Sequence, residues 1–249
     1  MLLGKIIILS QVALIPASYI GALLIDNFDI NTVLFLITLL LLFSFLLFFK
    51  INIRTIESGN VLNDVTKLLR TIPVRNIFFW ILEQFRIIGN LFFGLYIYIY
   101  VNNNIEYIGI LNFIVGISSM IFIHLFSKKI VDTKKDYIFV SSFLVALIYF
   151  IKLNVLNVYF FIFISIFQGL VDRMYELVTG NNVYSFGKDY NKISYIIVIE
   201  SLFNISRVLV CFIGLVFSFN IEYFLYLCAF IIIISGIVGF KYNKLHHMH

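Results

Sequence analysis

The feature of this sequence that most constrains its fold is a series of long apolar runs separated by short polar segments. A helix needs about 20 mostly apolar residues to cross the hydrocarbon core of a bilayer. The runs do not alternate apolar and polar residues, as the strands of a membrane β-barrel would. The sequence therefore predicts an all-α polytopic membrane bundle of about eight transmembrane helices. The predicted spans are Gly4–Ile25, Asn31–Lys50, Ile77–Val101, Tyr107–Phe126, Tyr137–Ile151, Val155–Val178, Ser194–Ser218 and Glu222–Phe240.

Composition excludes the main alternatives to a membrane protein. Hydrophobic residues make up 62% of the chain and charged residues 12%. A soluble domain has about 45–50% apolar residues and about 25% charged residues. Disordered chains are poor in apolar residues and rich in charge, so disorder is excluded as well. The two cysteines, Cys211 and Cys228, both lie in apolar runs and form neither a disulfide framework nor a metal cluster.

The basic residues gather in alternate loops, and this pattern predicts the orientation in the membrane. Cytoplasmic loops carry an excess of Lys and Arg. One set of loops contains Lys50, Arg54, Lys67, Arg70, Arg75, Lys128, Lys129, Lys134, Lys135, Lys188 and Lys192. The other set has Lys152 as its only base. We therefore expect a multi-pass protein of the cell membrane with both termini in the cytoplasm. Because the bases are dispersed over loops and do not form one solvated face, no nucleic-acid partner is expected.

The longest polar stretch divides the chain into three parts. Residues 1–50 are expected to form two transmembrane helices, residues 51–76 a cytoplasmic amphipathic linker, and residues 77–249 a six-helix bundle. Apolar residues between Val61 and Ile72 recur at helical spacing, and Pro73 is expected to end that helix. The helix either lies on the inner membrane face or packs on the bundle as an ordinary connection.

Two stripes of polar residues within predicted spans are the best candidates for function. Ionisable groups in the hydrocarbon are costly and therefore mark functional sites. The third span contains Glu83, Arg86 and Asn90, and the seventh contains Glu200, Asn204 and Arg207. In each set, spacings of three and four residues place the side chains on one helix face. These residues either have a role in substrate binding or ion coupling, or form a permanently paired network that locks two helices together.

The sixth span adds Gln168, Asp172, Arg173 and Glu176 near its cytoplasmic end. We interpret this group as a solvated helix end, with a gate formed by Asp172 and basic loop residues as the alternative. Catalytic motifs are missing: the sequence has neither a phosphate-binding G-x-x-x-x-G-K-[ST] loop nor an H-E-x-x-H metal site. The protein is therefore not expected to be an enzyme, and no cofactor or metal site is predicted.

Two segments resemble motifs of the major facilitator superfamily of transporters. Residues Ser18–Asp26 (SYIGALLID) are similar to the family's fifth-helix motif, with Ala22 in place of its proline. The loop Lys128–Lys135 (KKIVDTKK) is similar to the motif G-x-L-x-D-R-x-G-R-R. The order of spans resembles the last eight helices of the family: the end of the N-terminal half, the central loop and the whole C-terminal half.

This resemblance implies a secondary transporter that moves a small solute by alternating access, with protons as a candidate coupling ion. It also implies that Asp132, Lys134 and Lys135 belong to a cytoplasmic gate. Because the family encloses its substrate between two halves, the chain would need a partner subunit or the four missing N-terminal helices. Two other functions stay open: an accessory or truncated bundle without transport of its own, and a lipid-linked sugar flippase. The expected partners are thus the lipid bilayer, a small-molecule solute and protons.

Overall fold

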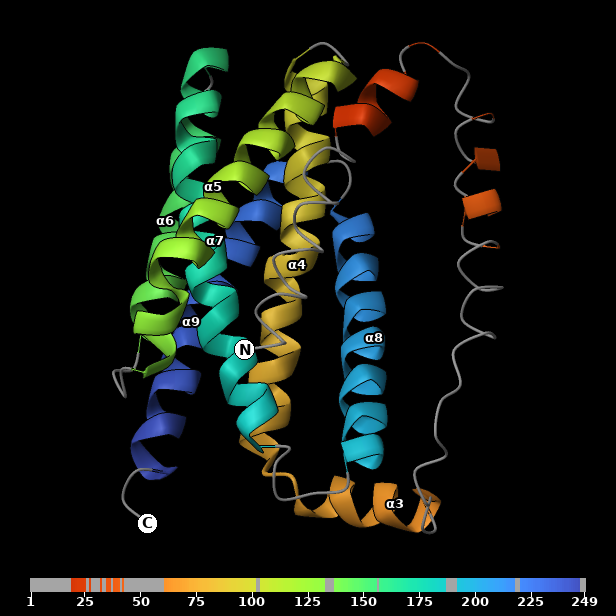
Figure 1. The fold of residues 1–249 in the computed structure, drawn as a ribbon, viewed down its shortest axis with the longest axis vertical. Helices are drawn as coiled ribbons and strands as arrows, with labels where there is room; N and C mark the ends of the chain where they lie inside the picture. The colour runs from red at the N-terminus through yellow and green to blue at the C-terminus, as the bar shows by residue number, and fades with distance from the viewer. Residues whose placement is uncertain are drawn as a thin grey trace.

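The computed structural model describes residues 19–25, 27, 32, 35–36, 38–40, 42, 61–101, 104–132, 137–155, 157–186, 192–217 and 220–246. Helices account for nearly all of these residues, and no strand occurs among them (Figure 1). The all-α prediction is therefore confirmed. Residues 19–25 of the first predicted span are helical. The rest of that span and most of the second, Asn31–Lys50, lie outside the described residues.

Seven helices follow along the described chain. They are α3 (Val61–Thr71), α4 (Val74–Tyr100), α5 (Ile105–Asp132), α6 (Ile138–Asn154), α7 (Val158–Phe186), α8 (Lys192–Val216) and α9 (Ile221–His246). Five of them, α4, α5, α7, α8 and α9, are long and apolar enough to cross a membrane, and α6 is a shorter apolar helix. These six helices coincide with the last six predicted spans, which confirms a polytopic membrane bundle.

Local sequence explains where several helices begin and end. Pro73 lies between α3 and α4, where its missing N–H and its restriction of the preceding residue stop the first helix. Asn104 accepts a hydrogen bond at Oδ1 from the backbone N–H of Tyr107 at 2.9 Å. Asn157 does the same for Tyr159 at 2.9 Å. Both asparagines satisfy N–H groups that the first turn of a helix leaves without partners, so they favour the starts of α5 and α7.

The helices pack chiefly as the pairs α5 with α7, α6 with α9, and α4 with α9, while α6 also contacts α7 and α4 contacts α8. A glycine permits the close approach of α5 and α7. Ser119 Oγ donates a hydrogen bond to the carbonyl of Gly169 at 2.9 Å, and a Cβ at Gly169 would overlap Ser118 Oγ. Small residues allow such contacts between helices in membranes, where packing drives association.

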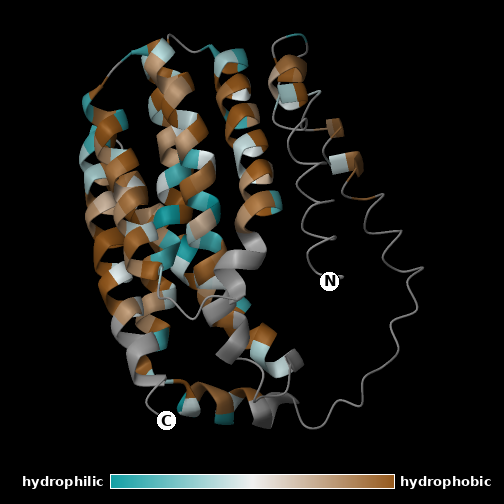
Figure 2. Ribbon diagram, turned by 60° about the vertical axis from the view of Figure 1, so that its left-hand side comes forward, coloured by the Kyte–Doolittle hydropathy of each residue, from teal (hydrophilic) through white to brown (hydrophobic). Residues whose placement is uncertain are grey.

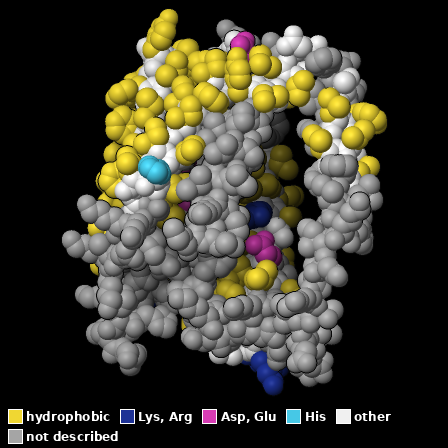
Figure 3. Space-filling view, viewed as in Figure 1, with side chains coloured by type: hydrophobic (Ala, Val, Ile, Leu, Met, Phe, Trp, Pro, Cys, Tyr) yellow, Lys and Arg dark blue, Asp and Glu magenta, His cyan; other side chains and the backbone are white. Residues whose placement is uncertain are grey.

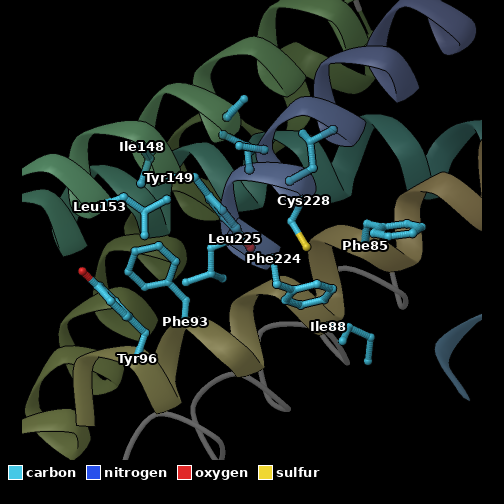
Figure 4. Close-up of a cluster of buried hydrophobic side chains, with 14 of the residues drawn as sticks. Phe85, Ile88, Phe93, Tyr96, Ile148, Tyr149, Leu153, Phe224, Leu225 and Cys228 are labelled. Atoms are coloured by element: carbon cyan, nitrogen blue, oxygen red, sulfur yellow. The ribbon is translucent and has the colours of Figure 1, made fainter. Parts of the chain in front are cut away.

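The main apolar core lies between α4, α6 and α9. Figure 4 shows side chains from these three helices pointing toward one another around Phe93. The Phe93 ring meets Tyr149 edge-on at 5.3 Å and Tyr96 at 5.7 Å between ring centres. Such edge-to-face pairs stabilise the contact beyond the burial of apolar area alone.

Helix α3 crosses the end of the bundle at which α4 and α8 begin (Figure 1). It packs against α8 and buries Leu68 and Ile72 in a second apolar cluster with Trp80 of α4. The helix thus packs on the bundle through one face. Trp80 is 3% exposed inside this cluster because α3 covers it.

The outside of the bundle is apolar as well as its core, unlike the outside of a soluble protein. On the face seen in Figure 3, hydrophobic side chains cover most of the described surface. Hydrophilic residues instead appear partway along the helices, between apolar stretches (Figure 2). A surface of this kind matches a lipid environment, which cannot solvate charges.

Candidate functional site

The candidate site is centred on Arg86, which lies near the middle of α4 and whose side chain is 5% exposed. Three carboxylates surround its guanidinium group. The nitrogen–oxygen distances are 4.0 Å to Glu83, 4.0 Å to Asp172 and 3.6 Å to Glu176. The pair of Glu83 and Arg86 on one face of α4 agrees with the spacing in the sequence. The other two carboxylates come from α7, so the cluster joins two helices.

Asp172 is held by neutral amides as well as by Arg86. Gln168 Nε2, one turn earlier on α7, donates to Asp172 Oδ2 at 3.2 Å, and Asn90 Nδ2 approaches the same oxygen at 3.5 Å. The hydroxyl of Tyr149 donates to Asn90 Oδ1 at 2.7 Å. These contacts link α4, α6 and α7 around one carboxylate.

Lys152 extends the same network from α6. Its ammonium group donates a hydrogen bond to Gln168 Oε1 and lies 5.1 Å from the centre of the Phe93 ring. The sequence placed Lys152 in a loop between spans, and that assignment is wrong. Because α6 continues to Asn154, Lys152 lies in its last turn with 4% of its surface exposed.

The guanidinium of Arg86 also contacts an aromatic ring. Its central carbon lies 4.9 Å from the centre of the Tyr175 ring, a cation–π geometry. Tyr175 is fully buried, and its hydroxyl lies 3.2 Å from Ser235 Oγ of α9. Within the described chain, Arg86 Nε has no hydrogen-bond partner. Arg86 is therefore held by charge and by a ring face and leaves one buried donor unused.

The remaining charges of α7 lie at the edge of the cluster. Arg173 pairs with Glu176 three residues later. Asp172 was expected at a solvated helix end, but its side chain is 14% exposed and faces Arg86. That interpretation is therefore wrong for Asp172, whereas Glu176 is 41% exposed and fits it better. The reason is that α7 runs well beyond its predicted end at Val178, which places Asp172 deeper in the bundle.

The predicted stripe of α8 forms a separate group. Glu200 and Asn204 are exposed and Arg207 is half-buried. Arg207 donates from Nε to Gln84 Oε1 of α4 at 2.9 Å and from a terminal nitrogen to Asn204 at 3.4 Å. The described residues contain no ion pair between the α8 stripe and Glu83 or Arg86. A neutral glutamine joins the two stripes.

Of the residues expected at the cytoplasmic gate, Asp132 ends α5. Its side chain, together with Lys134 and Lys135, lies outside the described residues, so that expectation stays a prediction. Asp172, the fourth residue expected there, contacts α4 as described above.

Sequence reasoning missed Tyr149, Tyr175, Lys152 and Gln84 as members of the site. The polar residues of α7 had a signal, because Gln168, Asp172 and Glu176 follow one another at four-residue spacing and were named on that helix. The two tyrosines carry no such signal, since they lie in aromatic-rich runs.

Comparison of the chain with protein-family models, with curated proteins and with solved structures gives no match in any of the three.

Proposed function

We propose that this protein is a non-enzymatic secondary transporter that moves a small solute across the cell membrane by alternating access, with protons as a candidate coupling ion. The observation that carries the proposal is the contact of one buried arginine, Arg86 of α4, with the carboxylates Asp172 and Glu176 of α7. Ionisable groups at this depth are costly and mark substrate or ion pathways in membrane proteins.

The geometry of the cluster supports exchangeable contacts. Charge-assisted hydrogen bonds between nitrogen and carboxylate oxygen have lengths of about 2.7–2.9 Å. The distances from Arg86 to its three carboxylates are 3.6–4.0 Å. Such contacts attract through charge without fixed hydrogen-bond geometry. A proton or a polar solute can therefore replace one of them at a lower cost than in a tightly bonded pair.

The polar face of α8 is the second support. Glu200 and Asn204 are exposed on an otherwise apolar helix, and a polar stripe at membrane depth requires water or protein beside it. Arg207 connects this face with α4 through Gln84. The arrangement is compatible with the C-terminal half of a major facilitator transporter. On that view, a partner subunit or further helices complete the pathway.

A static accessory bundle is the rival function, and one observation favours it. The described cluster contains as many bases (Arg86, Lys152, Arg173) as acids (Glu83, Asp172, Glu176). A balanced network of this kind is able to lock α4, α6 and α7 together without any transport.

Transport is best tested in proteoliposomes that contain a pH-sensitive dye. Pools of amino acids, sugars, polyamines and organic anions are added outside under an imposed membrane potential. We expect one pool to produce a solute-dependent change in internal pH with the unmodified chain, and Asp172→Asn, Glu200→Gln and Arg207→Ala to abolish it. Glu106→Gln, at the first turn of α5, is the matched control and should retain the flux.

The rival predicts a different outcome. If no pool gives flux and the exchange Arg86→Asp with Asp172→Arg restores the thermal stability that each single change removes, the cluster is a structural lock. Flux in the unmodified chain that persists in all three site variants would remove these residues from the mechanism.

A further inference from the structure

The outer faces of α3 combine positive charge with exposed apolar side chains. Leu68 and Ile72 are buried toward Tyr195, Val198 and Ile199 of α8, which fixes the orientation of the helix on the bundle. On its other faces Lys67 and Arg70 are exposed, and neither forms an ion pair with a described acidic side chain.

Large apolar side chains are also exposed on α3 and at the start of α4. Leu69 is 44% exposed, and Val74, at the first position of α4, is 80% exposed. Both lie at the end of the bundle at which α4 and α8 enter their membrane-spanning segments. At this level we expect a side chain to meet lipid headgroups and the adjoining acyl chains.

This combination fits one partner. Lys and Arg at a membrane surface attract anionic lipids, and apolar residues of an interfacial helix enter the boundary between headgroups and acyl chains. A soluble acidic protein would pair with the two bases but would not explain the exposed Leu69 and Val74 at the membrane edge. A zwitterionic lipid would accommodate the apolar residues but offers no net charge to the bases.

We propose that α3 is a binding surface for anionic phospholipids, in which Lys67 and Arg70 hold the phosphate headgroups while Leu69 and Val74 contact the acyl chains. Because the buried face of α3 packs on α8 and covers Trp80, bound lipid stabilises the position of α3 against the bundle.

The chain contains a built-in reporter for this contact. Trp80 is its only tryptophan and lies in the cluster beneath α3. The protein is placed in nanodiscs of phosphatidylcholine alone or of phosphatidylcholine with phosphatidylglycerol. Nanodiscs expose both membrane faces, so the result does not depend on orientation. Two quantities are measured: the thermal midpoint of the change in Trp80 emission, and hydrogen exchange in residues 61–72.

In the unmodified chain we expect phosphatidylglycerol to raise the midpoint and to slow the exchange, and salt to weaken both effects. The variant Lys67→Gln with Arg70→Gln should lose the lipid-dependent shift, while Lys67→Arg with Arg70→Lys should retain it. The variant Lys241→Gln with Lys244→Gln removes two bases from the last turns of α9. It should also retain the shift, which separates α3 from charge in general.

Three results would overturn the proposal. The first is an equal midpoint in the two lipid compositions. The second is a lipid-dependent shift that survives the double glutamine variant. The third is the same stabilisation by glycerol phosphate added to phosphatidylcholine nanodiscs, which would assign the surface to free phosphate. Trp80 emission of each variant in phosphatidylcholine checks that its fold is intact before the lipids are compared.

Discussion

Arg207 of α8 donates a hydrogen bond from Nε to Oε1 of Gln84 on α4 at 2.9 Å. Gln84 is fully buried, and its Nε2 donates in turn to the carbonyl of Trp80 at 3.1 Å. The charged side chain of Arg207 on α8 is therefore held by the amide of Gln84, which is itself hydrogen-bonded to the backbone of its own helix, α4. This contact joins the polar face of α8 to α4 through a neutral amide.

Replacing Gln84 with leucine should destabilise the protein, because Arg207 Nε loses its acceptor on the buried side chain of Gln84. The expected loss is about 1.5–3 kcal/mol, the range for hydrogen bonds to charged groups. The variant Gln84→Glu keeps an acceptor and is the control. The stability of both variants is measured by thermal unfolding in detergent, followed by Trp80 emission. Equal stability of Gln84→Leu and the unmodified chain would show that the hydrogen bond contributes nothing.

Arg86→Met should be among the most destabilising single substitutions in the described helices. It leaves Glu83 and Asp172 buried without their cation. Removing one partner of a buried ion pair typically lowers the free energy of unfolding by about 3–5 kcal/mol. A double-mutant cycle with Asp172→Asn should give a larger coupling energy than one with Glu176→Gln. The reason is that water screens Glu176, at 41% exposed, more than Asp172, at 14%. A larger coupling to Glu176 would contradict this ranking.

Gly89 and Gly94 on α4 offer a matched test of helix packing. A Cβ at Gly89 would lie 2.9 Å from the hydroxyl of Tyr149 and 3.2 Å from Cβ of Cys228, whereas a Cβ at Gly94 meets nothing within 4 Å. We expect Gly89→Ala to cost about 1–3 kcal/mol through overpacking. Gly94→Ala should leave stability unchanged or slightly higher, because alanine favours helix. The comparison is made by thermal unfolding of the two variants, and equal midpoints would count against the close contact of α4 with α6 and α9.

The two native cysteines test whether the polar face of α8 meets water. Cys211 lies four residues after Arg207 on that face and is half-buried, whereas Cys228 is fully buried. A water-soluble thiol reagent applied to the protein in membranes should modify Cys211 and leave Cys228 intact until denaturation.

The control for this labelling uses the lipid-facing side of the same helix. Leu209 is 57% exposed and Phe212 is 66% exposed. In a Cys211→Ser background, Leu209→Cys and Phe212→Cys should stay unmodified, because a water-soluble reagent does not enter hydrocarbon. Labelling at 209 or 212 equal to that at 211 would mean that α8 has no distinct polar side.

The helices were predictable from the sequence because each depends on its own residues. Apolar length fixes a membrane span, and Pro73 fixes the boundary between α3 and α4. The pair of Glu83 and Arg86 was predictable for the same reason, since a spacing of three residues places two side chains on one helix face.

The partners of Arg86 on α7 were not predictable in this way. Which side chains approach Arg86 depends on how the whole bundle packs, and both the α7 stripe and the α8 stripe offered a carboxylate. Lys152 shows a related limit. A basic residue near the end of an apolar run is ordinarily a loop residue, and only the neighbouring Gln168 and the Phe93 ring make its burial favourable.

Helix α6 has 17 residues, which at about 1.5 Å per residue gives a length of about 26 Å, shorter than the hydrocarbon core of about 30 Å. Its outward residues, Phe139, Val140, Phe143 and Leu147, are apolar and exposed. Lys152 in its last turn is directed inward to Gln168, so it cannot reach the headgroups to extend the span. The flank of the bundle formed by α6 therefore has a hydrophobic mismatch with a bilayer of average thickness. We expect the bilayer to be thinner beside α6 and the protein to be best matched to the thinner regions of its membrane.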